Sequence, residues 1–276
     1  CLFCISLYGL NAIGLFGSWK LKSTQPTVGL FSGKSLGTGV TTFIAAAVVS
    51  FWIVSPAEIQ TGKSVQSFEV ASGMNVLDII EPLSIEMPLD GSEPIMGNRE
   101  APIQLVEFAD FECPHCGQVA PQLKQLVKDH DDTNLRFKQY PLSNICNPNI
   151  GHEFHKNACN ASAATECAHL QGKFWQLSER LFKSQKHLSR SDINFQAERV
   201  GLDLGTFASC MDDSSQRAQI MTGIAADISV ADKVNVTGTP SIYLRAAYPD
   251  ASKAIWYKFS GSVAELEKVL EALRQR

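Results

Sequence analysis

The feature that most constrains this fold is a cysteine pair at the junction between an apolar segment and an amphipathic one. The apolar run over 103–109 predicts a buried strand, and from Gly117 onward apolar side chains recur at helical spacing, namely Val119, Leu123, Leu126 and Val127. The pair Cys113-Pro114-His115-Cys116 therefore lies at a strand-to-helix turn, with Cys113 at the helix N-terminus. Unpaired backbone N–H groups and the helix dipole there favour a thiolate, which is the species that performs disulfide exchange. The pattern predicts a redox site.

The chemistry of this turn leaves alternatives at two neighbouring positions. We expect the outer sulfur of Cys113 to be presented to solvent and Cys116 to be shielded. His115 is either a solvated residue of the first helical turn or a donor or positive charge that stabilises the Cys113 thiolate. Glu107, six residues before Cys113, lies inside an apolar strand. A buried carboxylate is costly without a role or a partner, so Glu107 is either functional or a satisfied structural residue near a strand end.

Zinc is the competing explanation for the cysteine pair, and the sequence does not favour it. A structural zinc site needs four ligands, usually from two such pairs. The second pair, Cys1 and Cys4, lies in an apolar segment. His152, His155, Cys159 and His169 hint at a metal site but lack an acidic fourth ligand at helical spacing. We therefore expect no metal.

The remaining cysteines point to an oxidising compartment. The chain has eight cysteines, and an even count fits disulfide formation outside the cytosol. We favour structural disulfides between Cys146 and Cys159 and between Cys167 and Cys210, with buried free thiols as the alternative. Each bridge would stabilise the fold by about 2–4 kcal/mol. The net charge of −4, with no dense basic block, gives no indication of nucleic-acid binding.

Two uncharged stretches near the N-terminus predict transmembrane helices within residues 1–56. Residues 1–19 and 35–57 carry no charged side chain, and the second stretch would span roughly 34 Å as a helix. The loop between them holds Lys20, Lys22 and Lys34 and no acid, which places it in the cytoplasm. Cys1, Cys4 and everything after Ser55 would then face the opposite side. A signal peptide is the alternative for 1–19, and buried core helices are the alternative for both.

The rest of the chain predicts an α/β domain behind a linker. Residues 57–98 are mixed in composition and read as a linker with at most a short helix or strand. The domain over 99–276 shows strand and helix patterns at these ranges: strands 103–109, 134–140, 241–245 and 255–259, and helices 114–130 and 262–275. A helical block, about 148–232, interrupts this order. The arrangement resembles the thioredoxin core with a helical insertion.

Three motifs together resemble the DsbA-type thiol oxidoreductases. They are Val106-Glu107-Phe108-Ala109-Asp110-Phe111-Glu112-Cys113-Pro114-His115-Cys116, Val236-Thr237-Gly238-Thr239-Pro240-Ser241 and Gly172-Lys173-Phe174-Trp175. The resemblance implies a cis Thr239–Pro240 bond, which would expose the Thr239 backbone beside Cys113 for an extended substrate peptide. It also implies that Glu107 handles the Cys116 proton. We expect the pKa of Cys113 to lie well below neutrality and the domain to oxidise its substrates.

The N-terminal Cys1-Leu2-Phe3-Cys4, followed by Tyr8 and Asn11, resembles the last catalytic cysteine pair of vitamin K epoxide reductase homologues. Some bacterial members of that family carry a thioredoxin-like domain behind the membrane part. By this resemblance the chain looks like the tail of such a fusion, without its upstream helices and loop cysteines. Cys1 and Cys4 would accept electrons from Cys113 and Cys116 through those loop cysteines and pass them to a membrane quinone. The alternative is a coincidental pair of thiols in an apolar helix.

These features predict a membrane-tethered thiol–disulfide oxidoreductase that introduces disulfides into exported proteins. Its catalytic domain would lie on the periplasmic side of a bacterial inner membrane, with unfolded or reduced exported proteins and a quinone as partners. No cofactor is expected in the soluble domain. The alternatives are a disulfide isomerase or reductase, and a non-catalytic adaptor that binds thiols or peptides.

Overall fold

The computed structural model describes residues 75–247 and 254–275, which belong to one compact unit. The two membrane helices predicted for 1–56, together with Cys1 and Cys4, lie outside the described residues. Within the two described ranges, no helix combines the length and the apolar character needed to cross a bilayer.

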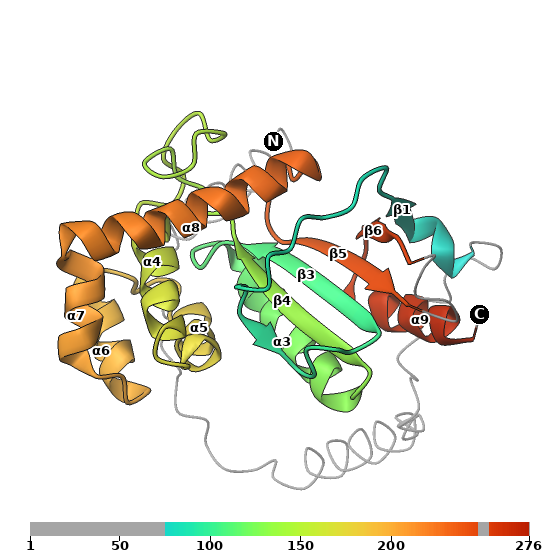
Figure 1. Ribbon diagram of the computed structural model, residues 1–276, viewed down its shortest axis with the longest axis horizontal. Coiled ribbons are helices and arrows are strands. Elements are labelled where there is room, and N and C mark those ends of the chain that lie inside the picture. Colours follow the sequence, from blue (N-terminus) through green and yellow to red (C-terminus); the bar gives the residue numbers. More distant parts are fainter. Residues whose placement is uncertain (1–74, 248–253, 276) are drawn as a thin grey trace, which may run out of the picture. The chain divides into compact units, whose positions relative to one another are not determined.

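A six-stranded sheet in the order β1-β6-β5-β3-β4-β2 forms the centre of this unit (Figure 1). Strand β3 (Ile103–Ala109) pairs in parallel with β4 (Thr133–Gln139) and antiparallel with β5 (Ser241–Ala246). Strand β6 (Trp256–Phe259) lies beyond β5. Six of the seven β3 residues are buried, which explains the continuous apolar run in the sequence.

Both edges of the sheet come from the segment predicted to be a linker. A 3-10 helix, η1 (Val76–Ile79), leads into β1 (Ile80–Pro82), which pairs with β6, and β2 (Ile95–Met96) pairs with β4. The prediction that the domain begins at residue 99 is therefore wrong. Strands of three and two residues are too short to show the alternation by which a strand is found in sequence.

Helices α3 (Pro114–Asp129) and α9 (Val263–Arg274) share one core with the sheet. Leu105 of β3 packs there with Leu123 of α3 and Leu266 of α9, all fully buried. Helix α9 begins where Ser262 and Glu265 form a capping box. Both helices agree with the predicted ranges to within a residue at each end.

The predicted helical insertion is present between β4 and β5. Within the described residues it consists of α4 (Ala158–His169), α5 (Phe174–Lys183), α6 (Arg190–Arg199), α7 (Leu204–Asp212) and α8 (Ser214–Lys233). A disulfide between Cys167 and Cys210 ties α4 to α7. Figure 1 shows α4 to α7 grouped beside the sheet and α8 running back from them.

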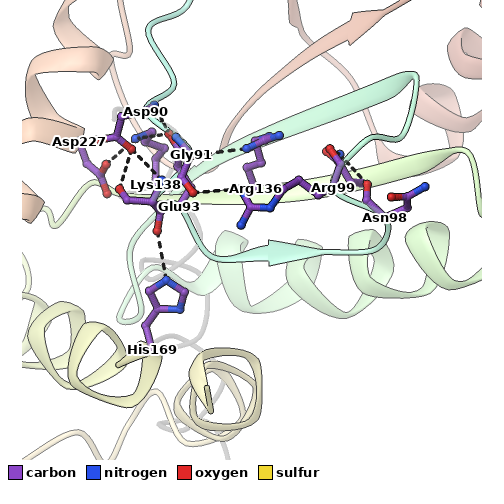
Figure 2. A network of polar contacts seen from close by, with 11 residues as sticks. Asp90, Gly91, Glu93, Asn98, Arg99, Arg136, Lys138, His169 and Asp227 are labelled. Carbon is purple, nitrogen blue, oxygen red and sulfur yellow. Dashed lines mark hydrogen bonds and ion pairs between the residues drawn. The ribbon is translucent and has the colours of Figure 1, made fainter. Parts of the chain in front are cut away.

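A network of buried charges fastens α8 and the N-terminal segment to β4 (Figure 2). The Lys138 ammonium lies 3.1 Å from Glu93 and 2.8 Å from Asp227. Arg136 adds a second contact to Glu93, at 3.4 Å. Glu93 also accepts from the backbone N–H groups of Asp90 and Gly91. Because every charge has an opposite partner, the cost of removing these groups from water is offset.

Candidate active site

The cysteine pair lies where β3 gives way to α3. Cys113 is the N-cap of α3, and Pro114 occupies the first helical position, where a missing N–H group costs nothing. Cys116 follows in the first turn. Both cysteines are free thiols in the structure.

The buried carboxylate of Asp110 fixes the shape of this turn. One of its oxygens accepts from the backbone N–H of Glu112 at 2.6 Å, and the other accepts from that of Leu142 at 2.6 Å. Its carbonyl oxygen accepts from the N–H of Cys113 at 3.1 Å. The sequence analysis included Asp110 only as part of a motif, so its organising role is a finding of the structure.

The loop before β5 brings Pro240 against the cysteine pair. The Thr239–Pro240 bond is cis, and Cys113 Sγ lies 3.3 Å from the carbonyl oxygen of Thr239. The loop is held from behind by two buried tyrosines: Tyr243 donates to Val234 and Tyr140 donates to Val236. The structure thus has the arrangement that the DsbA-type resemblance implied.

The exposure of Cys113 differs from our expectation. We predicted that its sulfur would be presented to solvent, but Cys113 is only 6% exposed. The Thr239 backbone covers the sulfur, an effect that strand and helix patterns do not reveal. Cys116 is fully buried, so Cys113 is still the outer residue of the pair.

The surroundings of the two sulfurs give them opposite protonation states. The pKa of Cys113 is lowered to about 5, chiefly by the Cys116 thiol. The Thr239 side chain and the backbone N–H groups of Cys116 and His115 lower this pKa further, against burial, which raises it. The pKa of Cys116 is raised by burial, by its hydrogen bond to Cys113 and by the charge on Glu107. Near neutral pH, Cys113 is the thiolate and Cys116 the thiol.

His115 acts through its backbone in this structure. Its side chain is exposed, whereas its N–H group lowers the pKa of Cys113. We had predicted either a solvated side chain or an imidazole that stabilises the thiolate. The exposed position agrees with the first alternative, and the backbone contribution is an addition to both.

Glu107 is a buried acid with an unpaired oxygen. It is 1% exposed, and its Oε1 has no hydrogen-bond partner within the described residues. Burial, followed by the charge on Cys113, raises its pKa to about 8. Glu107 lines a cavity of about 310 Å³ together with residues of α3 and α5, including Pro121, Trp175 and Ser178. In this part of the chain Trp175 Nε1 and Ser178 Oγ are likewise buried without a partner.

Gln185, which the sequence analysis missed, anchors the turn from the loop after α5. Its side-chain amide donates to the carbonyl of Cys113 at 2.7 Å and to that of Phe111 at 3.0 Å. A Cβ atom at Gly117 would lie only 2.4 Å from Gln185 Oε1. Gly117 is therefore the one local signal of this contact, and it does not identify the partner.

The other cysteines and histidines occupy separate positions. Cys146 is bonded to Cys159 and Cys167 to Cys210, the pairing that the sequence analysis favoured. His155 lies 3.0 Å from Asp110, and His169 contacts the carbonyl of Ser92. Among the residues that the structure describes, no group of three or more His, Cys, Asp or Glu could hold a metal ion.

Comparison with known proteins places this fold in a family. A family model described as Thioredoxin matches residues 90–253, more than half of the chain. The chain is 33% identical over 163 residues to the Na(+)/H(+) antiporter NhaA 3 of Salinispora tropica, covering 59% of this chain and 23% of that protein. It is 27% identical over 258 residues to the Na(+)/H(+) antiporter NhaA 1 of Mycobacterium sp. (strain KMS), covering 88% of this chain and 39% of that protein. The chain thus spans less than half the length of these relatives.

Solved structures show the same architecture at low sequence identity. A thioredoxin-like oxidoreductase from Silicibacter pomeroyi superposes with a TM-score of 0.53 at 22% identity, covering 68% of this chain and 95% of that one. BdbD from Bacillus subtilis, in its oxidised form, gives a TM-score of 0.53 at 18% identity, covering 69% and 97%. These likenesses show a mixed α/β thioredoxin-like fold.

Proposed function

We propose that this chain, which belongs to the thioredoxin family, is a thiol–disulfide oxidoreductase that introduces disulfides into exported proteins. The observation that carries the proposal is the asymmetry of the cysteine pair. Cys113 has a lowered pKa at a helix N-terminus beside a cis proline, and Cys116 has a raised one. The names of structural neighbours add support, since one is a thiol-disulfide exchange protein of Wolbachia pipientis.

The reaction starts from the oxidised enzyme, with a bond between Cys113 and Cys116. A substrate thiolate attacks Cys113 Sγ, a bond forms between the two proteins, and the electron pair of the broken disulfide passes to Cys116. A second substrate thiolate then attacks the substrate sulfur of this mixed disulfide and releases Cys113 as a thiolate. The substrate loses two electrons and the cysteine pair gains them.

Glu107 is placed to supply the proton that Cys116 needs when it leaves. Its pKa of about 8 keeps it protonated at neutral pH, and its charge acts on the pKa of Cys116. After the proton has passed to Cys116, Glu107 recovers one through the cavity between α3 and α5, where Trp175 and Ser178 offer further polar atoms. General acid catalysis requires this match between pKa and operating pH.

A groove along the cis-proline loop fits a polypeptide substrate. It has a volume of about 370 Å³ and is lined by 237–242 of the loop, by 258–261 and by Val119. The backbone of Thr239 lies beside Cys113, so a peptide bound in extended form could pair with this loop while its cysteine reaches the sulfur.

The lowered pKa of Cys113 favours oxidation of substrates over their reduction. A thiol with a pKa of about 5 is stabilised as a thiolate at pH 7 by about 3 kcal/mol. This free energy favours the reduced enzyme and corresponds to about 60 mV for a two-electron couple. A reductase would lack this bias, a disulfide isomerase would be distinguished by its redox potential, and a non-catalytic adaptor would show no turnover.

Oxidation of a reduced test protein measures the proposed function. We expect the full chain to catalyse disulfide formation with multiple turnovers when a disulfide such as oxidised glutathione is supplied. The Cys113→Ser variant should lose this activity, and Ser209→Ala, a matched change on α7, should keep it. Equal rates for the wild-type and Cys113→Ser proteins would refute the proposal.

The membrane attachment and the route of reoxidation belong to the same proposal. The relatives are named Na(+)/H(+) antiporters, which supports a membrane-bound context. One structural neighbour is a periplasmic thioredoxin-like protein of Salmonella enterica, which supports a position of the domain on the periplasmic side. We propose that Cys1 and Cys4 return electrons from Cys113 and Cys116 to a quinone. In cells, Cys1→Ser with Cys4→Ser should then leave Cys113 reduced. An unchanged redox state of Cys113 would exclude this route.

A further inference from the structure

A second loop, besides the one that carries Gln185, braces the active-site turn. Residues 142–157 run between β4 and α4, and their contacts concentrate on two acids of the turn. His155 Nδ1 lies 3.0 Å from Asp110 Oδ2. Asn157 donates to Glu112 twice, from its backbone N–H at 2.7 Å and from its side-chain amide at 2.9 Å.

His155 is the base that faces the buried Asp110, and it carries a positive charge there when it is protonated. The Asp110 carboxylate is fully buried three residues before Cys113, and its other two contacts are neutral backbone N–H groups. The titratable groups that act on His155 are Asp110, Glu112 and Cys113. Its hydrogen bond to Asp110 raises the pKa of His155, burial opposes this, and the charges on all three acids add to it.

The coupling between His155 and Cys113 acts in both directions. The Cys113 thiolate raises the pKa of His155. Since a coupling free energy is shared equally by its two sites, a protonated His155 favours the Cys113 thiolate to the same extent.

The disulfide between Cys146 and Cys159 closes the loop that presents His155. The two residues are 13 positions apart, and Cys159 lies in the first turn of α4, just after Asn157. The first half of the loop is anchored in the core, where Ser143 and Asn147 are fully buried. The half that carries His155 is less covered, since Phe154 is 61% exposed. In this second half, the disulfide and the contacts to Asp110 and Glu112 tie the loop to α4 and to the turn.

We propose that His155 is a positioning residue that stabilises the Cys113 thiolate through Asp110, and that the Cys146–Cys159 disulfide holds it there. This inference rests on the proposed function and explains how the charge of the same site is set. It also makes the redox state of a second disulfide a determinant of Cys113 reactivity.

The test compares a neutral and a cationic replacement of His155 in the full chain. The readout is the pH dependence of iodoacetamide alkylation at Cys113, followed by mass spectrometry on the peptide that carries it, with the Cys113–Cys116 pair reduced. His155→Gln should raise the apparent pKa of Cys113 and lower its thiolate fraction at pH 5 about three- to tenfold. His155→Lys keeps a cation at this position and should restore most of the thiolate.

His152→Gln is the matched control on the same loop. His152 packs against Phe154 with the two rings tilted and their centroids 3.8 Å apart. It has no contact with the turn among the described residues, so its replacement should leave the Cys113 profile unchanged. Equal profiles for His155→Gln and wild type would overturn the inference. A wild-type pKa near 8 would overturn the proposed function instead, which distinguishes the two failures.

The disulfide is tested by removing each of the two structural bridges in turn. The double variant Cys146→Ser with Cys159→Ser should raise the apparent pKa of Cys113, as His155→Gln does. Adding His155→Gln to this double variant should then raise that pKa little further. Cys167→Ser with Cys210→Ser removes the bridge between α4 and α7 and should lower stability without moving the profile. Equal shifts for the two bridge variants, or none for the first, would refute the role of the Cys146–Cys159 bridge.

Discussion

Two buried carboxylates in this domain have opposite surroundings. Glu107 lies on β3, and Glu93 packs against the neighbouring strand β4. Glu93 contacts Lys138 and Arg136 and accepts two backbone N–H groups (Figure 2). Glu107 has an oxygen without a partner in the described part of the chain, beside a cavity and the cysteine pair. A paired buried charge contributes to the structure, whereas an unpaired one retains a movable proton. The difference separates the part of the molecule that holds the fold from the part that carries the chemistry.

The largest expected effect comes from breaking the paired network at its centre. Lys138→Met leaves Glu93 and Asp227 buried without their shared cation, so we expect the free energy of unfolding to fall by about 3–5 kcal/mol. Urea denaturation at pH 7 measures this loss. The exposed Lys186→Met is the matched control and should change stability by less than about 0.5 kcal/mol. A loss of that small size for Lys138→Met would mean that the network does not hold the fold.

A second variant, Glu107→Gln, should increase the stability of the protein at high pH. Because the pKa of Glu107 is raised to about 8, the folded protein keeps a proton that the unfolded chain releases at much lower pH. The stability of the reduced wild type therefore decreases as pH rises from about 4.5 to about 8 and stays low above that range. Glu107→Gln removes this decrease and should be more stable than wild type at pH 9 by about 1–3 kcal/mol.

The same variant should also slow the chemistry. Without an acid at this position, substrate oxidation at pH 7 should slow by about a hundredfold. Stopped-flow kinetics and denaturation at pH 5 and pH 9 measure the two effects, with Glu198→Gln on α6 as the exposed control. A variant that is destabilised at pH 9 and retains full activity would identify Glu107 as an ordinary structural residue.

The smallest effect should come from the polar lining of the cavity. Ser178→Ala removes a buried hydroxyl that has no protein partner in the described ranges, so stability should change by less than about 1 kcal/mol. If the cavity returns protons to Glu107, oxidation should slow about two- to fivefold and more strongly above pH 8. Ala120→Ser, on the α3 side of the same cavity, serves as the control. Unchanged kinetics for Ser178→Ala would remove this residue from the proton route.

The sequence predicted the centre of the fold because the relevant signals are local. The apolar run at 103–109 and the periodicity after Gly117 are each contained within one element, and β3 and α3 follow them closely. The edge strands were missed because Ile80–Pro82 and Ile95–Met96 are defined by pairing with distant strands. No local pattern encodes that pairing.

The residues of the site likewise fall into those with a local sequence signal and those defined by distant contacts. Cys113, Cys116 and Glu107 could be singled out from residue type and spacing alone. Gln185 was not singled out, and His155 was considered only as a metal ligand, since their partners in the turn lie 72 and 45 positions away in the sequence. The burial of Cys113 depends on Thr239, which is 126 positions away. Reactivity at this sulfur is therefore set by contacts that only the folded chain brings together.

The most direct test of the central claim is the pKa of Cys113 in the full-length protein, measured from the pH dependence of its alkylation. The account predicts a value of about 5, with Cys116 unreactive over the same range. A value near 8 or 9, equal to that of an ordinary thiol, would contradict it.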